Sequence, residues 1–113
     1  AGMESYSTVL GYPLALGAVS LDTASGLLRV GDSEIALTGA EQRILEILMR
    51  TPGQVVGRDQ IGLYALGRKP DRYDRSIDTH ISALRKKLRP DGGEEALSIR
   101  NLRGLGYVLA GAD

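Results

Sequence analysis

Four aliphatic residues at helical spacing in the C-terminal half of the chain constrain its fold more than any other feature. They recur at i, i+4, i+7 and i+11, which makes one narrow apolar stripe on an α-helix: Ile77, Ile81, Leu84 and Leu88. At about 100° per residue, the opposite side carries short or basic side chains and no acid, namely Arg75, Ser76, Thr79, Ser82, Ala83, Lys86 and Lys87. The pattern predicts a helix over residues 73–88 with one buried face.

The exposed side of this helix is compatible with the major groove of DNA. Short and basic side chains can approach base edges and phosphates, whereas bulky or acidic ones would clash or be repelled. An ordinary solvated helix face would show the same pattern, and the helix taken alone favours that plainer interpretation. The rest of the chain must decide between the two.

The charge of the chain argues in both directions. The formal net charge is zero over 113 residues, which by itself argues against a nucleic-acid binder. The distribution is uneven: residues 1–57 carry 3 basic and 6 acidic side chains, and residues 58–113 carry 11 and 8. The segment from Arg75 to Arg89 contains five basic residues and one acid, Asp78. The positive field is therefore local, and we expect modest affinity for non-specific DNA.

Length and composition limit the class of protein. A chain of 113 residues is expected to form one domain with a real core. No apolar run approaches the roughly 18–20 residues that span a bilayer, and no signal peptide is visible. The absence of cysteine rules out disulfides and fits a cytoplasmic location. Residues 1–11 have no clear period, so we expect a flexible lead-in whose first three residues resemble a cloning scar, ahead of a domain at 12–110.

Short apolar runs and turn residues predict the other elements. Thr38 and Glu41 form a capping box at the start of a first helix that buries Ile44, Leu45, Ile47 and Leu48. A second helix is expected from Arg58 to about Leu66, stopped by Gly67. The predicted strands are 14–16, 19–21, 27–30 and 34–37 at the N-terminus and 99–102 and 106–109 at the C-terminus. The fold class is therefore α+β: a winged helix-turn-helix with an N-terminal four-stranded antiparallel sheet, a three-helix core and a C-terminal β-hairpin wing.

Four motifs in order carry a family resemblance. They are Leu37-Thr38-x-x-Glu41, Gly53-Gln-Val-Val56-x-Arg58, the helix motif from Asp74-Arg75-Ser-Ile-Asp78 to Leu88, and Leu102-Arg103-Gly104-x-Gly106-Tyr107. With them the chain resembles the DNA-binding effector domain of OmpR/PhoB-type response regulators over about residues 14–109. Any one motif is weak, whereas all four at the right distances are specific.

The resemblance implies a function and partners. It implies a non-enzymatic domain without cofactor, metal or membrane partner that binds double-stranded DNA sequence-specifically as the effector of a two-component transcription regulator. The helix 73–88 would enter the major groove and the hairpin 99–109 would lie at the minor groove. The isolated domain would be monomeric, pairing head to tail on direct-repeat half-sites. The full-length protein would add a receiver domain, served by a sensor kinase, and activators of the family contact RNA polymerase. A winged-helix module used only for protein–protein contact remains an alternative.

The resemblance also assigns roles to residues. The base-facing positions are Ser76, Thr79, Ala83 and, in the minor groove, Arg103. The phosphate-contacting positions are Arg58, Arg75, His80, Ser82, Arg85, Lys86, Lys87, Asn101 and Tyr107. The polymerase-contact loop would present Arg68, Lys69, Asp71, Arg72 and Tyr73. Ser82 and Ala83 stand where some relatives have arginines, so we expect fewer direct base hydrogen bonds and more recognition through methyl groups, water or shape.

The only histidine, His80, does not indicate catalysis. Ser76 and His80 lie on neighbouring faces of the helix, but Asp78 points about 160° away from each, so the three cannot form a hydrolytic triad. No second histidine or cysteine exists to complete a zinc site. We expect the two acids on this flank, Asp74 and Asp78, to be structural and to hold the helix against its partner. Ser82 and the second helix are the candidate partners of Asp78, with a direct Asp78–Arg85 pair as the alternative.

Overall fold

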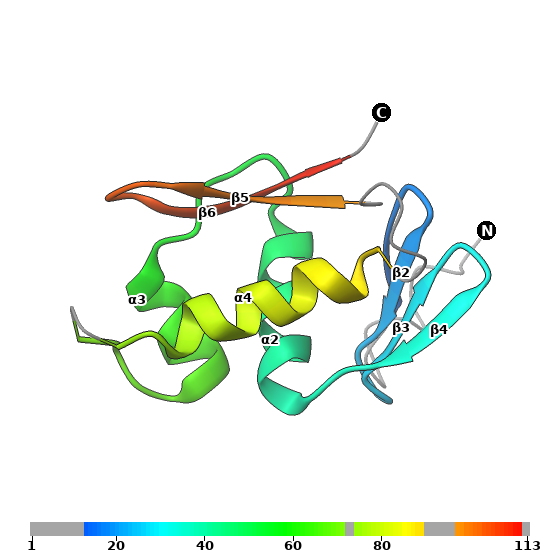
Figure 1. The fold of residues 1–113 in the computed structure, drawn as a ribbon, viewed down its shortest axis with the longest axis horizontal. Coiled ribbons are helices and arrows are strands. Elements are labelled where there is room, and N and C mark those ends of the chain that lie inside the picture. Colours follow the sequence, from blue (N-terminus) through cyan, green and yellow to red (C-terminus); the bar gives the residue numbers. More distant parts are fainter. Residues whose placement is uncertain (1–12, 72–73, 90–96, 112–113) are drawn as a thin grey trace, which may run out of the picture.

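The computed structural model describes residues 13–71, 74–89 and 97–111. The N-terminal sheet is formed by β1 (Pro13–Leu16), β2 (Val19–Asp22), β3 (Leu27–Val30) and β4 (Ser33–Ala36). The helices are α2 (Gly39–Arg50), α3 (Arg58–Ile61) continued by η1 (Gly62–Leu66), and α4 (Ser76–Lys87). The C-terminal hairpin pairs β5 (Leu97–Leu102) with β6 (Gly106–Gly111). This α+β architecture of sheet, three helices and hairpin confirms the predicted fold (Figure 1). The lead-in expected at 1–11 lies outside the described residues.

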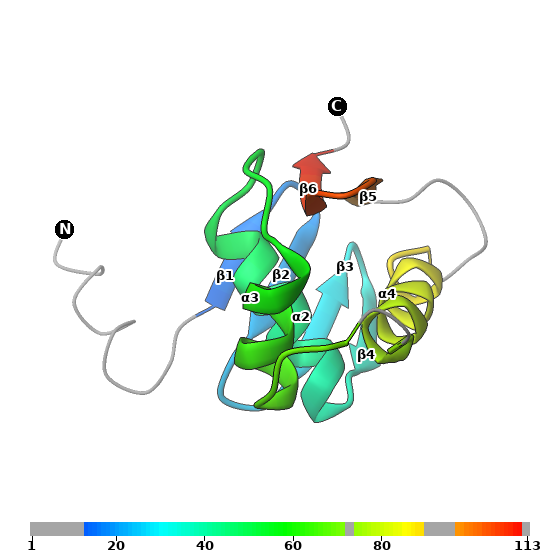
Figure 2. The same ribbon diagram turned by 90° about the vertical axis from the view of Figure 1, so that its left-hand side faces the viewer.

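The N-terminal sheet is antiparallel and follows chain order, β1-β2-β3-β4. Each of its strands lies within one residue of its predicted bounds. Leu21 pairs with Leu28 across β2 and β3, and both are fully buried. Alternate residues of a strand face opposite sides, so this pair marks the face that packs on the helices. Two views show α2 between that sheet and α3 (Figures 1 and 2).

The capping box predicted for α2 is present. The Thr38 hydroxyl accepts from the Glu41 amide at 3.2 Å, and the Glu41 carboxylate accepts from the Thr38 amide at 3.0 Å. Each side chain thus satisfies a backbone donor that the first turn leaves without a partner. Of the residues predicted to point inward, Ile44, Leu45 and Leu48 are buried, while Ile47 is only half-buried.

The second helix differs from the prediction in its winding. Only Arg58–Ile61 is α-helical, and Gly62–Leu66 continues as a π-helix before Gly67 ends it at φ 75°. Periodicity and propensity cannot distinguish the two windings over so few residues. Gly62 lies against the returning loop, because a Cβ there would come within 2.6 Å of both the Arg68 carbonyl oxygen and the Pro70 ring.

The stripe helix α4 is shorter than predicted. It runs from Ser76 to Lys87 rather than over 73–88. The Asp74 carboxylate, just before the first turn, accepts a hydrogen bond from the Ser76 amide at 2.9 Å. A side chain that takes a backbone donor in this way favours a turn over a helix at these residues. The apolar stripe is confirmed, since Ile77, Ile81, Leu84 and Leu88 are all at most 1% exposed.

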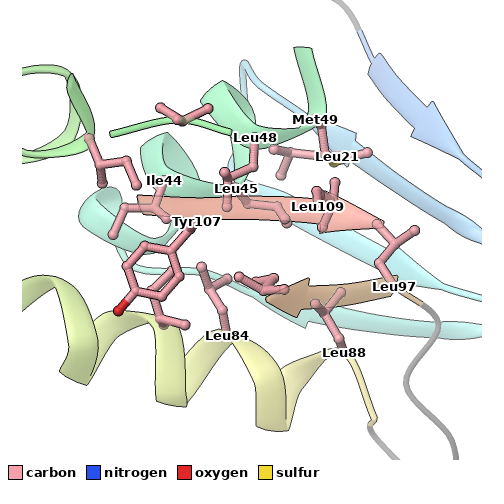
Figure 3. Close-up of a cluster of buried hydrophobic side chains, with 14 of the residues drawn as sticks. Leu21, Ile44, Leu45, Leu48, Met49, Leu84, Leu88, Leu97, Tyr107 and Leu109 are labelled. Carbon is pink, nitrogen blue, oxygen red and sulfur yellow. The ribbon is translucent and has the colours of Figure 1, made fainter. Parts of the chain in front are cut away.

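The C-terminal hairpin closes the core. Its strands are longer than predicted and enclose the predicted turn, in which the Leu105 amide donates to the Leu102 carbonyl at 2.8 Å. Leucines of α4 and α2 pack against Leu97, Tyr107 and Leu109 (Figure 3). The backbones of Val56 and Tyr107 form an antiparallel bridge. The Asp91-Gly-Gly turn predicted before β5 lies outside the described residues.

Candidate nucleic-acid interface

The outward side of α4 carries one exposed ridge. Its members recur at i, i+4, i+7, i+11 and i+14 from Arg75: Arg75, Thr79, Ser82, Lys86 and Arg89. The three inside the helix lie at nearly the same angle around its axis, whereas Arg75 is the N-cap and Arg89 comes two residues after the last helical residue, Lys87. All are exposed, and none of the three cations forms an ion pair with another described residue. We call these five residues the exposed ridge. Cations that pair with no described residue lie at both of its ends, and two small hydroxyl side chains lie between them.

The three helix positions predicted to face bases differ in exposure. Thr79 lies on the exposed ridge, whereas Ser76 and Ala83 are half-buried on its flank. The Thr79 hydroxyl donates to the Arg75 carbonyl at 3.0 Å, so its proton is already used within the helix. The Ser76 hydroxyl accepts from Arg68 at 3.4 Å. His80 is half-buried.

The flank of α4 nearest the wing holds a polar cluster around Asp78. One carboxylate oxygen of Asp78 accepts from the Tyr107 hydroxyl and, at 3.0 Å, from Arg58. Arg58 also donates to the Asp74 carbonyl at 2.8 Å. Burial, followed by the Asp78 carboxylate, raises the pKa of Tyr107 to about 12. The expected structural role of Asp78, with the second helix as its partner, is confirmed.

Two further residues predicted to contact phosphate are used inside the domain. Arg85 donates from Nε and Nη2 to the Ile99 carbonyl at 3.1 and 2.7 Å, and the structure gives no Asp78–Arg85 pair among the described contacts. Tyr107 is only 2% exposed. Arg58, Arg85 and Tyr107 therefore hold elements of the domain together in this structure, because each bonds to a residue of another element. Of these contacts, the sequence indicated only the one between Asp78 and the second helix.

Lys87 lies on the other flank of α4 and pairs with α2. Its ammonium binds the Glu41 carboxylate and approaches the Ala36 carbonyl at 3.4 Å. The Glu41 residue is 4% exposed. Burial raises the pKa of Glu41, but the Lys87 ammonium and the Thr38 amide outweigh burial and leave that pKa below its usual value of 4.5. Lys87 thus neutralises a buried carboxylate of the capping box.

The loop before α4 is tied to the start of the helix. Arg68 pairs with the Asp74 carboxylate, while Lys69 and Asp71 are exposed. Hydrogen bonds from Ser76 and the ion pair with Arg68 hold the pKa of Asp74 well below its usual value of 3.8. The predicted contact residues Arg72 and Tyr73 lie outside the described residues. Leu63 on η1, which the sequence did not single out, is 52% exposed.

The wing tip presents polar side chains to solvent. Asn101 and Arg103 are exposed, and Asn101 is opposite Tyr107 in the strand register. Arg100 is exposed on the other face of β5, a cation that sequence reasoning missed. A shallow hollow next to the tip is lined by Gly57, Arg58, Asp59, Gly104 and Leu105.

Neither a metal cluster nor a membrane span is present in the described part of the chain. No group of three or more His, Cys, Asp or Glu side chains there could hold a metal ion. None of its helices is long and apolar enough to cross a membrane.

Comparison with known proteins identifies the family. The profile of the family described as "Transcriptional regulatory protein, C terminal" matches residues 32–109. The chain belongs to this family. It is an effector domain of the OmpR/PhoB response-regulator type, a family of transcription regulator domains and not of enzymes.

The relatives of the effector domain support this assignment. It is 34% identical to the transcriptional regulatory protein CpxR of Klebsiella pneumoniae over 110 residues, covering 96% of this chain and 47% of CpxR. It is 35% identical to protein PetR of Rhodobacter capsulatus over 103 residues, covering 86% and 43% of the two chains. The chain thus spans less than half the length of these curated relatives.

Solved structures match the effector domain over most of its length. The DNA-binding domain of CpxR from E. coli superposes with a TM-score of 0.80 at 33% identity, covering 91% of this chain and all of that one. The Klebsiella pneumoniae RstA DNA-binding domain, in complex with the RstA box, gives a TM-score of 0.75 at 32% identity over 88% and 98% of the two chains.

The sequence predicted which face of α4 is exposed, and the structure confirms that exposure. The predicted contact residues did not include Arg89, which is exposed two residues beyond the end of α4. The i+14 spacing from Arg75 could have found it. Helical spacing places Lys86 opposite the apolar stripe and Lys87 about 100° away on the flank, but no sequence signal identifies Glu41 as the partner of Lys87.

Proposed function

We propose that this effector domain binds double-stranded DNA sequence-specifically, with α4 in the major groove and the wing tip at the minor groove. The observation that carries the proposal is the exposed ridge of α4, whose cations at both ends pair with no other described residue. A major groove about 12 Å wide admits a helix, and the fully buried stripe on the opposite side holds α4 rigidly against the core. The related RstA DNA-binding domain was solved in complex with the RstA box, which supports DNA binding as the function of this domain.

The residues divide into those that position the domain and those that read sequence. Arg75, Lys86 and Arg89 would contact phosphates from the ridge, joined by Ser82, the flanking His80 and, from the wing, Asn101. Thr79 would face the bases, with Ser76 and Ala83 beside it, and Arg103 would enter the minor groove. Because the centre of the ridge carries only short side chains, sequence would be read largely through methyl groups, water and DNA shape.

In the full-length protein, we propose control by a receiver domain and a sensor kinase. Two copies would bind head to tail on direct-repeat half-sites about 10–11 bp apart, one helical turn of DNA. The loop containing Arg68, Lys69 and Asp71 would be available to RNA polymerase. The relatives CpxR and PetR are about twice as long as this chain, which supports a further domain in the full-length protein. The pairing on DNA and the polymerase contact rest on the resemblance to the response-regulator family.

Titration of labelled duplex by fluorescence anisotropy tests DNA binding directly. Three ridge cations on phosphates predict that log K falls with log salt with a slope of about −2.7, at ~0.9 per contact. Lys86→Gln should reduce this slope, whereas Arg29→Gln should not, because Arg29 lies on β3 and pairs with Glu34. Selection from a random oligonucleotide pool then reports the motif, the repeat orientation and the spacing.

A module used only for protein contact is the second candidate. The exposed apolar side chains Leu63 and Leu105, at 52% and 66%, favour it, as does the zero net charge. Under this alternative no duplex, random or selected, would bind at low salt. Measurable binding that weakens with salt decides for the DNA-binding proposal.

A further inference from the structure

The wing is attached to α4 by two polar contacts. Near the tip, the Tyr107 hydroxyl of β6 donates to Asp78 in the first turn of α4. Farther along, Arg85 of α4 donates twice to the Ile99 carbonyl of β5, at 3.1 and 2.7 Å. At a rise of 1.5 Å per residue, Asp78 and Arg85 are about 10 Å apart along the helix axis. Two separated polar attachments, added to the apolar packing, constrain the angle between the hairpin and the helix more than one would.

Apolar packing secures the wing from its base up to the Tyr107 ring, but not its tip. Leu97, Ile99 and Leu109 are buried, and they lie at the end of the hairpin remote from the turn. Residues 103–105 at the tip are exposed. The backbone bridge to Val56, with N–O distances of 2.8 and 2.9 Å, holds β6 against the segment before α3 and not against α4. The polar contacts therefore relate the tip to α4.

Asp78 is the point at which three elements meet. It belongs to α4, accepts from Tyr107 of β6 and pairs with Arg58 of α3. Figure 3 shows the Tyr107 hydroxyl directed toward α4. Asp78 is not on the exposed ridge, and a carboxylate would repel phosphate. Any effect of Asp78 on DNA binding must therefore act through the groups that it holds.

We infer that Asp78 is a positioning residue for DNA recognition, which sets the wing at the angle where α4 and Arg103 reach adjacent grooves together. This inference rests on the proposed function, since it presumes that Arg103 contacts DNA. Removing the Tyr107–Asp78 contact would leave the helix surface intact but let the tip shift. Small shifts matter here because hydrogen bonds to DNA weaken steeply with distance and angle.

A double-mutant cycle tests the inference. Tyr107→Phe removes only the hydroxyl donor and keeps both the buried ring and the backbone bridge to Val56. On a duplex with A·T-rich flanks, Arg103→Ala should weaken the wild-type domain by ~10-fold. In the Tyr107→Phe background, the loss of DNA affinity caused by Arg103→Ala should be at least ~3-fold smaller than in the wild type. Asp78→Ala should behave alike, and Tyr107→Phe keeps the test valid if Asp78→Ala fails to fold.

The control variant is Arg29→Gln, which breaks an exposed ion pair on the N-terminal sheet. It should combine additively with Arg103→Ala, since distant sites do not couple. If Tyr107 has only a structural role, Tyr107→Phe should lower Tm while Arg103→Ala reduces DNA affinity equally in both backgrounds. That result would overturn this inference and leave the proposed function standing. If Arg103→Ala costs nothing in the wild type, the proposed wing contact fails and the inference with it.

Discussion

The adjacent lysines Lys86 and Lys87 provide the sharpest test of the structure, because the structure places them in different surroundings. Lys86 is on the exposed ridge, whereas Lys87 binds the buried Glu41 carboxylate. Replacing either by methionine removes the charge at similar length and similar helix propensity. Any difference between the two variants then reflects their surroundings.

For Lys86→Met we expect weaker DNA binding at unchanged stability. One phosphate contact contributes about 0.9 to the salt slope, which corresponds to about eightfold in affinity at 0.1 M salt. Anisotropy titrations at several salt concentrations measure both quantities. Thermal unfolding should show little change, because a solvated surface substitution usually costs within about 0.5 kcal/mol.

For Lys87→Met we expect the reverse. A carboxylate only 6% exposed in its side chain loses its cation and keeps the Thr38 amide, which should cost about 1–3 kcal/mol and lower Tm by several degrees. The folded-state pKa of Glu41 lies below 4.5, so its stabilising contribution is complete above pH 4.5 and is lost as the pH falls through the lower folded value. The stability difference between wild type and Lys87→Met should therefore shrink at acid pH.

The result that refutes this reasoning is specific. If Lys87→Met reduces the salt slope at unchanged Tm, or Lys86→Met unfolds the domain with normal DNA binding, the assignment of the two flanks of α4 is wrong. Equal effects of both variants on the salt slope would also refute it, because a lysine held by Glu41 cannot contribute fully to phosphate binding.

The remaining predictions concern three other positions. Gly106→Ala should lower the free energy of unfolding by about 3 kcal/mol or more, because at φ 142° a Cβ there would lie 2.1 Å from the Val56 carbonyl oxygen. The control Gly104→Ala, at φ 79°, meets no neighbour and should cost less. Denaturant unfolding measures both. The pKa of Tyr107 is raised from its usual 10.0 to about 12 in the folded domain, so the stability that this residue contributes below pH 10 should be lost between pH 10 and 12. The fall in stability should be less steep in Tyr107→Phe. Parallel curves of stability against pH for the two proteins would contradict this. Thr79→Val should change the selected base at one position without altering the salt slope, and a reduced slope would instead place Thr79 on phosphate.

The local elements of this fold could be predicted from sequence because local physics determines them. The stripe of Ile77, Ile81, Leu84 and Leu88 requires a helix with one buried face, and all four are buried. The capping box at Thr38 and Glu41 depends on residues three apart, and it formed as expected. The start of α4 was wrong by three residues because Asp74 takes the Ser76 amide before the helix begins.

What the sequence by itself determined is which side of α4 faces solvent, since a periodic apolar stripe leaves the opposite side exposed whatever packs against it. Only the tertiary structure decided which polar residues on the two flanks remain free. Lys87, Arg85 and Arg58 find Glu41, the Ile99 carbonyl and Asp78 as partners, which are 14 to 46 residues away in the chain. Charge and spacing along one helix carry no information about such distant partners, because packing of separate elements brings them together.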